Sequence, residues 1–314
     1  MTNSPILCFG FDRPMHLERM LTSLQNNEES KTSIVYICID GPTEDTDLEM
    51  HSKTVKVAKK NWNFYEKNLI IREQNLTCRT NIIDTISEVF KVHDKLIILE
   101  DDLVLGPKFL SYMNNGLNIY EQNKNMWCIN GYTYRQLNNK TGSSISKYVS
   151  PWGWATWSDR WNIFVNQDYD KKNLISDLSV SERKKFNMEN LYDWENIIVK
   201  NEEGTISAWD AYWYQAIYLN NGFTLYPNKS HVINEGFDGT GMHCSDTNDW
   251  KTPLNSSETK RFPKQIKLSK LFMFNTLNFY RYYQFTRYLR YHKSKFSSFK
   301  NFSNFVLKKT GLKS

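Results

Sequence analysis

Short apolar runs alternate with amphipathic segments through the first 130 residues of the chain. Predicted strands cover residues 5–11, 33–39, 68–71, 96–99 and 127–129, with predicted helices between them at about 14–24, 47–60, 82–90 and 109–117. This alternation predicts right-handed crossovers and a mostly parallel sheet flanked by helices, which is an α/β fold of the Rossmann type. The later chain is less regular, with predicted helices at about 182–199 and 207–219 and a short strand at 223–227.

Polar residues follow the ends of successive predicted strands. They are Asp12 and Arg13 after the first strand, Asp40 after the second, and Glu100, Asp101 and Asp102 after the fourth. Because the carboxyl ends of parallel strands share one edge of a sheet, this pattern predicts a pocket there. Adjacent carboxylates repel one another, so a positive partner is expected. A hard divalent cation fits oxygen ligands of this kind, and a solvated acidic turn beside an arginine is the alternative.

Charge divides the chain into two regions. Residues 259–314 contain fourteen Lys and Arg and no Asp or Glu, whereas the remaining 26 basic and 34 acidic residues give residues 1–258 a net charge of −8. We predict a catalytic domain over 1–258, with halves at about 1–130 and 131–258, and a basic, aromatic helical tail over 259–314. A net positive charge confined to a tail does not indicate a nucleic-acid-binding protein.

The tail has two interpretations. Leucine, phenylalanine and tyrosine alternate with arginine over residues 271–291, which is too charged to span a bilayer. This composition favours contact between residues 265–314 and an anionic inner-membrane surface. The alternative is a helix packed on the catalytic domain.

The five cysteines are scattered and odd in number, which favours a reducing compartment over a disulfide framework. The first residues lead directly into a strand and lack the features of a signal peptide. We therefore expect a cytoplasmic protein, peripheral on the inner face of the membrane if the tail binds there. The chain contains no G-x-G-x-x-G, P-loop, His-Glu-x-x-His or Gly-x-Ser-x-Gly motif, which weighs against dinucleotide, P-loop and common hydrolase functions.

Three later segments carry candidate chemistry. Residues 150–161 contain four tryptophans, predicted as a mixture of satellite core and a wall against a sugar, with one or two rings exposed. Asp210 begins a predicted helix, where a carboxylate can act as a cap. The neighbouring aromatic residues predict a raised pKa that suits a general base. His243 lies in a glycine-rich loop, from which it could reach a phosphate or a metal.

The order of these motifs carries a family resemblance. Phe11-Asp-Arg-Pro14, Asp40-Gly41, Glu100-Asp-Asp102, Trp209-Asp-x-x-Trp213 and Gly239-x-Gly-x-His-Cys244 occur in that order. Over roughly residues 4–245 the chain resembles inverting nucleotide-sugar glycosyltransferases of the GT-A fold, in particular bacterial relatives of the N-acetylglucosaminyltransferase I type. The animal enzymes have an N-terminal membrane anchor and an extended C-terminal domain that this sequence does not match.

The resemblance implies a role for each candidate. Those near the donor are Arg13 at the diphosphate, Asp40 at the uracil, Arg79 as a further donor-side arginine, Glu100 and Asp101 at the ribose and sugar, and His243 facing the diphosphate or metal. Asp102 would be the metal ligand for Mn²⁺ or Mg²⁺, and Asp210 the catalytic base. The implied partners are a UDP-sugar and a glycan or lipid-linked glycan acceptor, as in bacterial surface polysaccharide assembly.

Two other functions remain open from the sequence. One is a sugar-nucleotide-binding or glycan-binding protein without turnover, which would keep the same ligand contacts. The other is a nucleotidyltransferase, which would also place acids around a metal at strand ends. A nucleotidyltransferase usually has a glycine-rich, basic loop after its first strand, and Phe11-Asp-Arg-Pro14 matches that poorly.

Overall fold

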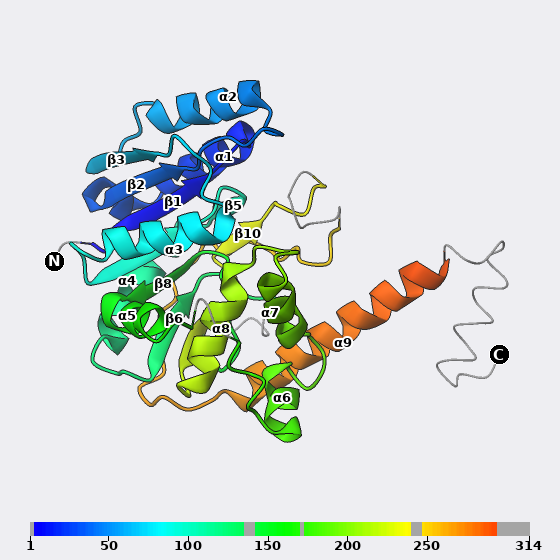
Figure 1. Cartoon of the computed structure of the whole chain (residues 1–314). Coiled ribbons are helices and arrows are strands. Elements are labelled where there is room, and N and C mark those ends of the chain that lie inside the picture. Colours follow the sequence, from blue (N-terminus) through cyan, green and yellow to red (C-terminus); the bar gives the residue numbers. More distant parts are fainter. Residues whose placement is uncertain (1–2, 135–141, 170–172, 240–246, 294–314) are drawn as a thin grey trace.

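A computed structural model of the chain, shown in Figure 1, describes residues 3–134, 142–169, 173–239 and 247–293. Its centre is an eight-stranded sheet with the strand order β3-β2-β1-β4-β8-β6-β9-β7. Helices cover both faces, with α1 packed beside α2 and α3 packed beside α8. This is the predicted α/β architecture of a mostly parallel sheet flanked by helices.

The first half of the chain follows the predicted alternation. The elements are β1 (Ile6–Gly10), α1 (Pro14–Gln25), a 3₁₀ turn η1 (Glu28–Thr32), β2 (Ile34–Ile39), α2 (Leu48–Lys59), β3 (Glu66–Ile71), α3 (Cys78–Val89) and β4 (Lys95–Leu99). β1 pairs in parallel with both β2 and β4, and β2 pairs in parallel with β3. All residues of β4 except Lys95 are buried, as expected for a strand covered on both faces.

The second half adds further elements. They are β5 (Leu103–Leu105), α4 (Phe109–Tyr120), β6 (Met126–Asn130), β7 (Ser143–Ser146), β8 (Trp154–Trp157), α5 (Ser158–Asn166), α6 (Val180–Phe186), α7 (Trp194–Glu202), α8 (Trp209–Leu219), β9 (Phe223–Pro227), β10 (Val232–Asn234) and α9 (Lys270–Lys293). Four of these strands, β5, β7, β8 and β10, are antiparallel to the strands with which they pair. β8 lies between β4 and β6 and is antiparallel to both. β5 and β10 form a separate antiparallel pair.

The tryptophan segment is a strand and a helix of the core. Trp154, Trp157 and Trp161 are at most 2% exposed, so these three rings form the core part of the predicted mixture. Trp152 alone of the four is partly exposed. The sequence did not reveal β8 because every residue in it is buried, which removes the alternation that marks a half-buried strand.

The helix predicted over residues 182–199 is two helices, α6 and α7. Met188, Glu189 and Asn190 between them all have positive φ angles, which reverses the chain. The side chain of Asn187 then accepts a hydrogen bond from the backbone of Glu195 in the first turn of α7. Apolar spacing alone cannot detect this turn, since buried Met188 continues the helical pattern across it.

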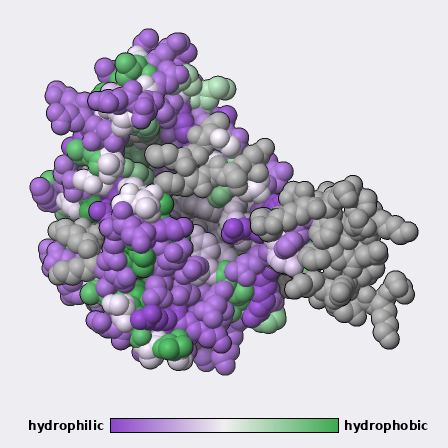
Figure 2. Space-filling model, turned by 45° about the vertical axis from the view of Figure 1, so that its right-hand side comes forward, coloured by the Kyte–Doolittle hydropathy of each residue, from purple (hydrophilic) through white to green (hydrophobic). Residues whose placement is uncertain are grey.

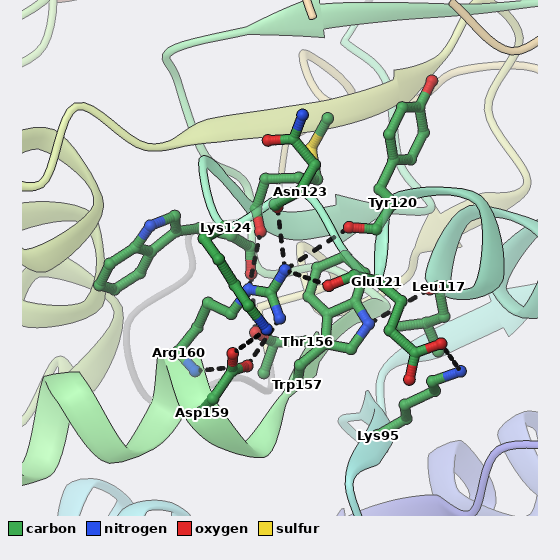
Figure 3. Close-up of polar contacts among 12 residues, drawn as sticks. Lys95, Leu117, Tyr120, Glu121, Asn123, Lys124, Thr156, Trp157, Asp159 and Arg160 are labelled. Carbon is green, nitrogen blue, oxygen red and sulfur yellow. Dashed lines mark hydrogen bonds and ion pairs between the residues drawn. The ribbon is translucent and has the colours of Figure 1, made fainter. Parts of the chain in front are cut away.

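Arg160 in α5 fixes the end of α4 to the central sheet. Its guanidinium, which is 2% exposed, donates to the carbonyls of Glu121 (2.8 Å), Asn123 (2.9 Å) and Met126 (3.2 Å), as Figure 3 shows. The guanidinium also lies 4.3 Å from the centroid of the Trp157 ring. These contacts give the Glu121 carbonyl a donor at the end of α4 and add a second donor to the Asn123 carbonyl, which also accepts from the backbone N–H of Met126.

Replacing Arg160 with methionine is expected to lower the free energy of unfolding by about 3 kcal/mol, because the hydrogen bonds of the buried guanidinium and its ion pair with Asp159 are lost. Urea denaturation of the purified variant measures this loss. Arg183→Met is the matched control, since Arg183 also donates to backbone carbonyls but its side chain is 41% exposed. We expect the control to lose less than about 1 kcal/mol. Equal losses in the two variants would contradict the role given to Arg160.

Helix α9 packs on the domain through one face. Phe279 and Tyr283 lie 5.3 Å and 4.7 Å from Trp250, measured between ring centroids, and Phe272 lies 4.8 Å from Tyr226. In Figure 1 the far end of α9 runs outward from the body of the protein. Across the described ranges, no helix combines the length and the apolar character needed to cross a bilayer. The predicted boundary between residues 258 and 259 stays a prediction.

Candidate active site

The candidate site lies where the strand order of the parallel sheet changes direction. From β1 the chain crosses to β2 on one side, while β4 pairs with β1 on the other. The residues after β1 and β4 therefore meet at a topological switch point, which is the usual ligand site of open α/β sheets. Arg13 follows β1, with Pro14 at the start of α1, and the acids Glu100, Asp101 and Asp102 follow β4.

Arg13 lies beside the acids, as the sequence predicted for a positive partner. Its guanidinium is 3.8 Å from the carboxylate of Asp101 and 4.0 Å from that of Asp102. These distances exceed those of hydrogen bonds, so the contact is electrostatic. One arginine does not neutralise three adjacent acids, and the site keeps an excess of negative charge.

Burial raises the pKa of every acid in the cluster. Burial and the Asp102 carboxylate raise the pKa of Asp101 to about 7, against the opposing effect of Arg13. Burial raises the pKa of Asp102 to about 6, although Arg13 lowers it. Burial, followed by the charges of Asp102, Asp210 and Asp101, raises the pKa of Glu100 well above its usual range. In the free protein these acids are therefore poorly compensated when ionised.

The small β5–β10 sheet holds Asp102 in place. Asn234 pairs with Leu103 across the two strands, and its side chain lowers the pKa of Asp102 through a hydrogen bond. The backbone N–H of Glu235 donates to the Asp102 carbonyl at 2.7 Å. A Cβ on Gly236 would lie 2.2 Å from Oδ2 of Asp102, so any other residue at Gly236 would displace that carboxylate.

Two residues beside Arg13 were not predicted from the sequence. Asp238 lies 3.4 Å from the Arg13 guanidinium and 3.0 Å from Nε2 of His16, which is itself 2.9 Å from Arg13. Desolvation and then the charges of Arg13 and Arg19 lower the pKa of His16, so its ring is neutral near pH 7. His16 follows Arg13 by three residues on α1, and this helical spacing is the signal that could have identified it.

Asp40 organises the loop after β3. One carboxylate oxygen accepts hydrogen bonds from the N–H groups of Gly41 (2.9 Å) and Leu76 (3.0 Å). Gly41 is required here, because a Cβ would lie 2.3 Å from the backbone of Gln74. The same loop holds Thr77 at a φ of 67°, which is strained for a β-branched residue and typical of functional sites. The expected contact between Asp40 and a uracil stays a prediction.

Asp210 and Arg79 come to the site from two adjoining helices. Asp210 lies in the first turn of α8, between the buried rings of Trp209 and Tyr212. The Arg79 guanidinium in the first turn of α3 lies 5.5 Å from the centroid of the Tyr212 ring. Burial raises the pKa of Asp210 to about 6, in the direction predicted from its aromatic neighbours.

The electrostatics show that these groups surround one point. The charges of Glu100, Asp210, Asp40 and Asp101 all act on the thiol of Cys78, whose pKa is raised first by burial and then by these four acids. Four acids from three separate parts of the chain thus gather around the start of α3. Of the predicted site residues, the structure brings together Arg13, Asp40, Arg79, Glu100, Asp101, Asp102 and Asp210. His243 lies outside the described residues.

The residues present fit a divalent cation that shares its ligands with a substrate. Within the described ranges, no three His, Cys, Asp or Glu side chains are arranged to hold a metal by themselves. Mg²⁺-type sites commonly take only one or two carboxylates from the protein and the remaining oxygens from water and phosphates. The carboxylate oxygens at Asp102 and the excess negative charge around it suit such a cation.

A cavity of about 270 Å³ borders the site on the side of α1. It shares Asn234 and Asp238 with the surroundings of Asp102, and its lining also includes Phe237 and Trp250. Trp152 contacts both of these rings, at 5.4 Å and 5.6 Å between centroids. Aromatic rings mixed with polar groups are a common lining for small-molecule sites.

The fold and the site together define an α/β protein with an acidic cluster at the switch point of its sheet. No protein-family model and no curated protein matches the chain. Among solved structures, S. aureus TarS is 10% identical, with a TM-score of 0.40, over 75% of this chain and 37% of TarS. A mannosyltransferase from Pyrobaculum calidifontis, PcManGT, in complex with GDP-Man and Mn²⁺, is 7% identical, with a TM-score of 0.39, over 70% of this chain and 73% of that protein. Likeness at this level does not define the chemistry of this chain.

Proposed function

We propose that this protein is a metal-dependent, inverting glycosyltransferase that moves a sugar from a UDP-sugar to an acceptor hydroxyl. The observation that supports this most directly is the convergence of Asp210 with the acids after β4, because one separate base then faces a donor-binding edge. The ordered motifs of the sequence point to the same reaction. We place it in the cytoplasm, in the assembly of a bacterial surface polysaccharide or glycoconjugate on a glycan or lipid-linked acceptor.

The donor would bind across the switch point of the sheet. Arg13 would contact the diphosphate, since it is the cation between the ends of β1 and β4. Asp40 would contact the uracil ring of the donor, and Glu100 and Asp101 would contact its ribose and its sugar. Arg79 would add a second positive charge. His243 is proposed to face the diphosphate or the metal.

Asp102 would hold Mn²⁺ or Mg²⁺ together with the donor phosphates. A cation bound there stabilises the negative charge that develops on the diphosphate as it leaves. Arg13, whose guanidinium lies 3.8 Å from Asp101 and 4.0 Å from Asp102, would contribute to the same stabilisation. The Asn234 side chain and the backbone of Glu235 keep the Asp102 carboxylate oriented for this role.

Asp210 would act as the general base. It accepts the proton of the acceptor hydroxyl while the hydroxyl oxygen forms a bond to the anomeric carbon. The bond from that carbon to the phosphate oxygen breaks, and its electron pair leaves with the nucleoside diphosphate. A single displacement of this kind inverts the anomeric configuration. Burial raises the pKa of Asp210 to about 6, so this carboxyl is ionised at pH 7.

A donor screen tests the proposal. We expect UDP-sugars, and not GDP- or CMP-sugars, to raise the melting temperature, and only with Mn²⁺ or Mg²⁺ present, because the cation bridges protein and phosphates. Stabilisation by a GDP-sugar with metal would instead identify guanine, and not uracil, as the nucleobase of the donor. If no sugar nucleotide stabilised the protein with either metal, the proposal would fail.

The released product separates the alternative functions. A glycosyltransferase releases a nucleoside diphosphate from its donor, and proton NMR of the transferred sugar reports the inverted anomeric centre. A nucleotidyltransferase would instead release pyrophosphate from a nucleoside triphosphate and a sugar phosphate. A binding protein would be stabilised by the sugar nucleotide and release neither product with any acceptor tested.

A further inference from the structure

Helix α9 has two apolar faces, of which only one packs on the domain. The inner face carries Phe272, Thr276, Phe279 and Tyr280, all less than 10% exposed. It is fixed further by a hydrogen bond from Gln284 to the Leu191 carbonyl, at 2.7 Å, and by an ion pair between Arg290 and Asp249. These contacts hold the inner face of α9 against the domain.

The outer face carries large side chains that the domain leaves exposed. They are Leu271 (60%), Phe274 (56%), Tyr282 (64%) and Phe285 (43%). At 100° per residue these four lie within about 80° of one another around the helix axis. The surface seen in Figure 2 is otherwise mainly hydrophilic, with small and separate hydrophobic groups. A stripe of four large apolar residues on one helix indicates an interaction surface.

Charge identifies the kind of partner. Lys270 and exposed Arg281 lie next to this outer stripe at helical spacing, and residues 259–314 hold fourteen basic residues and no acidic one. Contact between two α9 helices would bring these like charges together. The body of a second copy would match the basic charge, since residues 1–258 carry a net charge of −8, but its exposed large apolar residues, such as Met15, Leu48 and Val180, lie on separate helices. An anionic lipid surface instead matches both the basic charge and the aromatic and aliphatic stripe.

We propose that the outer face of α9, formed by Leu271, Phe274, Tyr282 and Phe285, binds the surface of an anionic lipid bilayer. The helix lies in the interface with these side chains in the acyl boundary and with Lys270 and Arg281 at the headgroups. The inner face stays packed on Trp250, so binding does not require α9 to leave the domain. This inference is independent of the proposed glycosyl transfer.

Vesicle flotation of the full chain tests it without any sugar nucleotide. We expect binding to vesicles that mix phosphatidylcholine with phosphatidylglycerol, little binding to phosphatidylcholine alone, and weaker binding at high salt. Phe274→Ser/Phe285→Ser should reduce the partition coefficient at least about tenfold, because two aromatic side chains that would insert into the bilayer are removed. The matched control is Leu48→Ser/Val180→Ser, which removes two exposed apolar residues from α2 and α6 and should bind as the wild type does.

Three results would overturn the proposal. The first is no binding to the mixed vesicles. The second is unchanged binding of the Phe274→Ser/Phe285→Ser variant when circular dichroism and melting temperature show that it is folded. The third is a wild-type dimer, measured by light scattering, that this variant converts to a monomer while vesicle binding persists, because the stripe would then bind a second copy.

Discussion

Replacing Asp210 with asparagine is expected to lower kcat by about 10²–10⁴-fold, the range found when a general base is removed. Asparagine keeps the size of the side chain and cannot accept the acceptor proton. KM for the sugar nucleotide should change little, since Asp210 is proposed to contact the acceptor and not the donor. Steady-state assays of nucleoside diphosphate release measure both constants.

The pH dependence of the wild type follows from the same residue. A base works in its ionised form, and burial raises the Asp210 pKa to about 6. The rate should therefore rise as the pH increases through about 6 and level off above it. Glu203→Gln makes the equivalent change on an exposed carboxyl just after α7, and should keep both the rate and the profile. If the Asp210→Asn variant had the wild-type kcat, Asp210 would not be the general base.

The parallel half of the fold could be predicted because its strands are buried on both faces and end in polar residues. The run Leu96–Leu99 is long enough to identify a strand, and the acids after it identify the ligand edge of the sheet. Arg13, Asp40 and the acids after β4 were placed together by topology alone. The structure adds that Arg13 lies about 4 Å from Asp101 and Asp102.

The rest of the site depends on contacts between distant segments. Strand β8 could not be predicted, because it is wholly buried and pairs with β4 and β6 rather than with its neighbours in sequence. Asp238 reaches Arg13 from 225 residues away. Three residues of β10 are too few to show a period, although they position Asn234 beside Asp102. Local patterns carry no information about pairings of this range.

The acids after β4 lower the folding stability of the free protein near pH 7, and Asp102 shows why. Asp102 has a folded pKa of about 6 against an ordinary value of 3.8, so its contribution to folding is fully present below about pH 4. That contribution is lost as the pH rises through about 6, because the ionised form is poorly compensated. A cation that binds the folded protein restores the lost stability. The ionised form of Asp102 that binds a cation near pH 7 is therefore also the form that lowers the stability of the free protein.

Replacing Asp102 with asparagine should separate these two effects. Without ligand, the variant is expected to melt about 2 °C higher near pH 7, since it removes an unfavourable buried charge. With a UDP-sugar and Mn²⁺ it should show none of the stabilisation expected for the wild type, and kcat/KM should fall by about 10²–10³-fold. Differential scanning fluorimetry and nucleoside diphosphate release measure the two results.

The combination of higher stability and lost metal response distinguishes a binding defect from a folding defect. Asp45→Asn is the matched control, because this exposed acid lies in the turn before α2 and away from Arg13. It should keep the wild-type melting temperature, metal response and rate. If Asp102→Asn kept the metal-dependent stabilisation, Asp102 would not be the metal ligand. Glu100 and Asp101 would then be the next candidates for the metal ligand, because their carboxylates also follow β4.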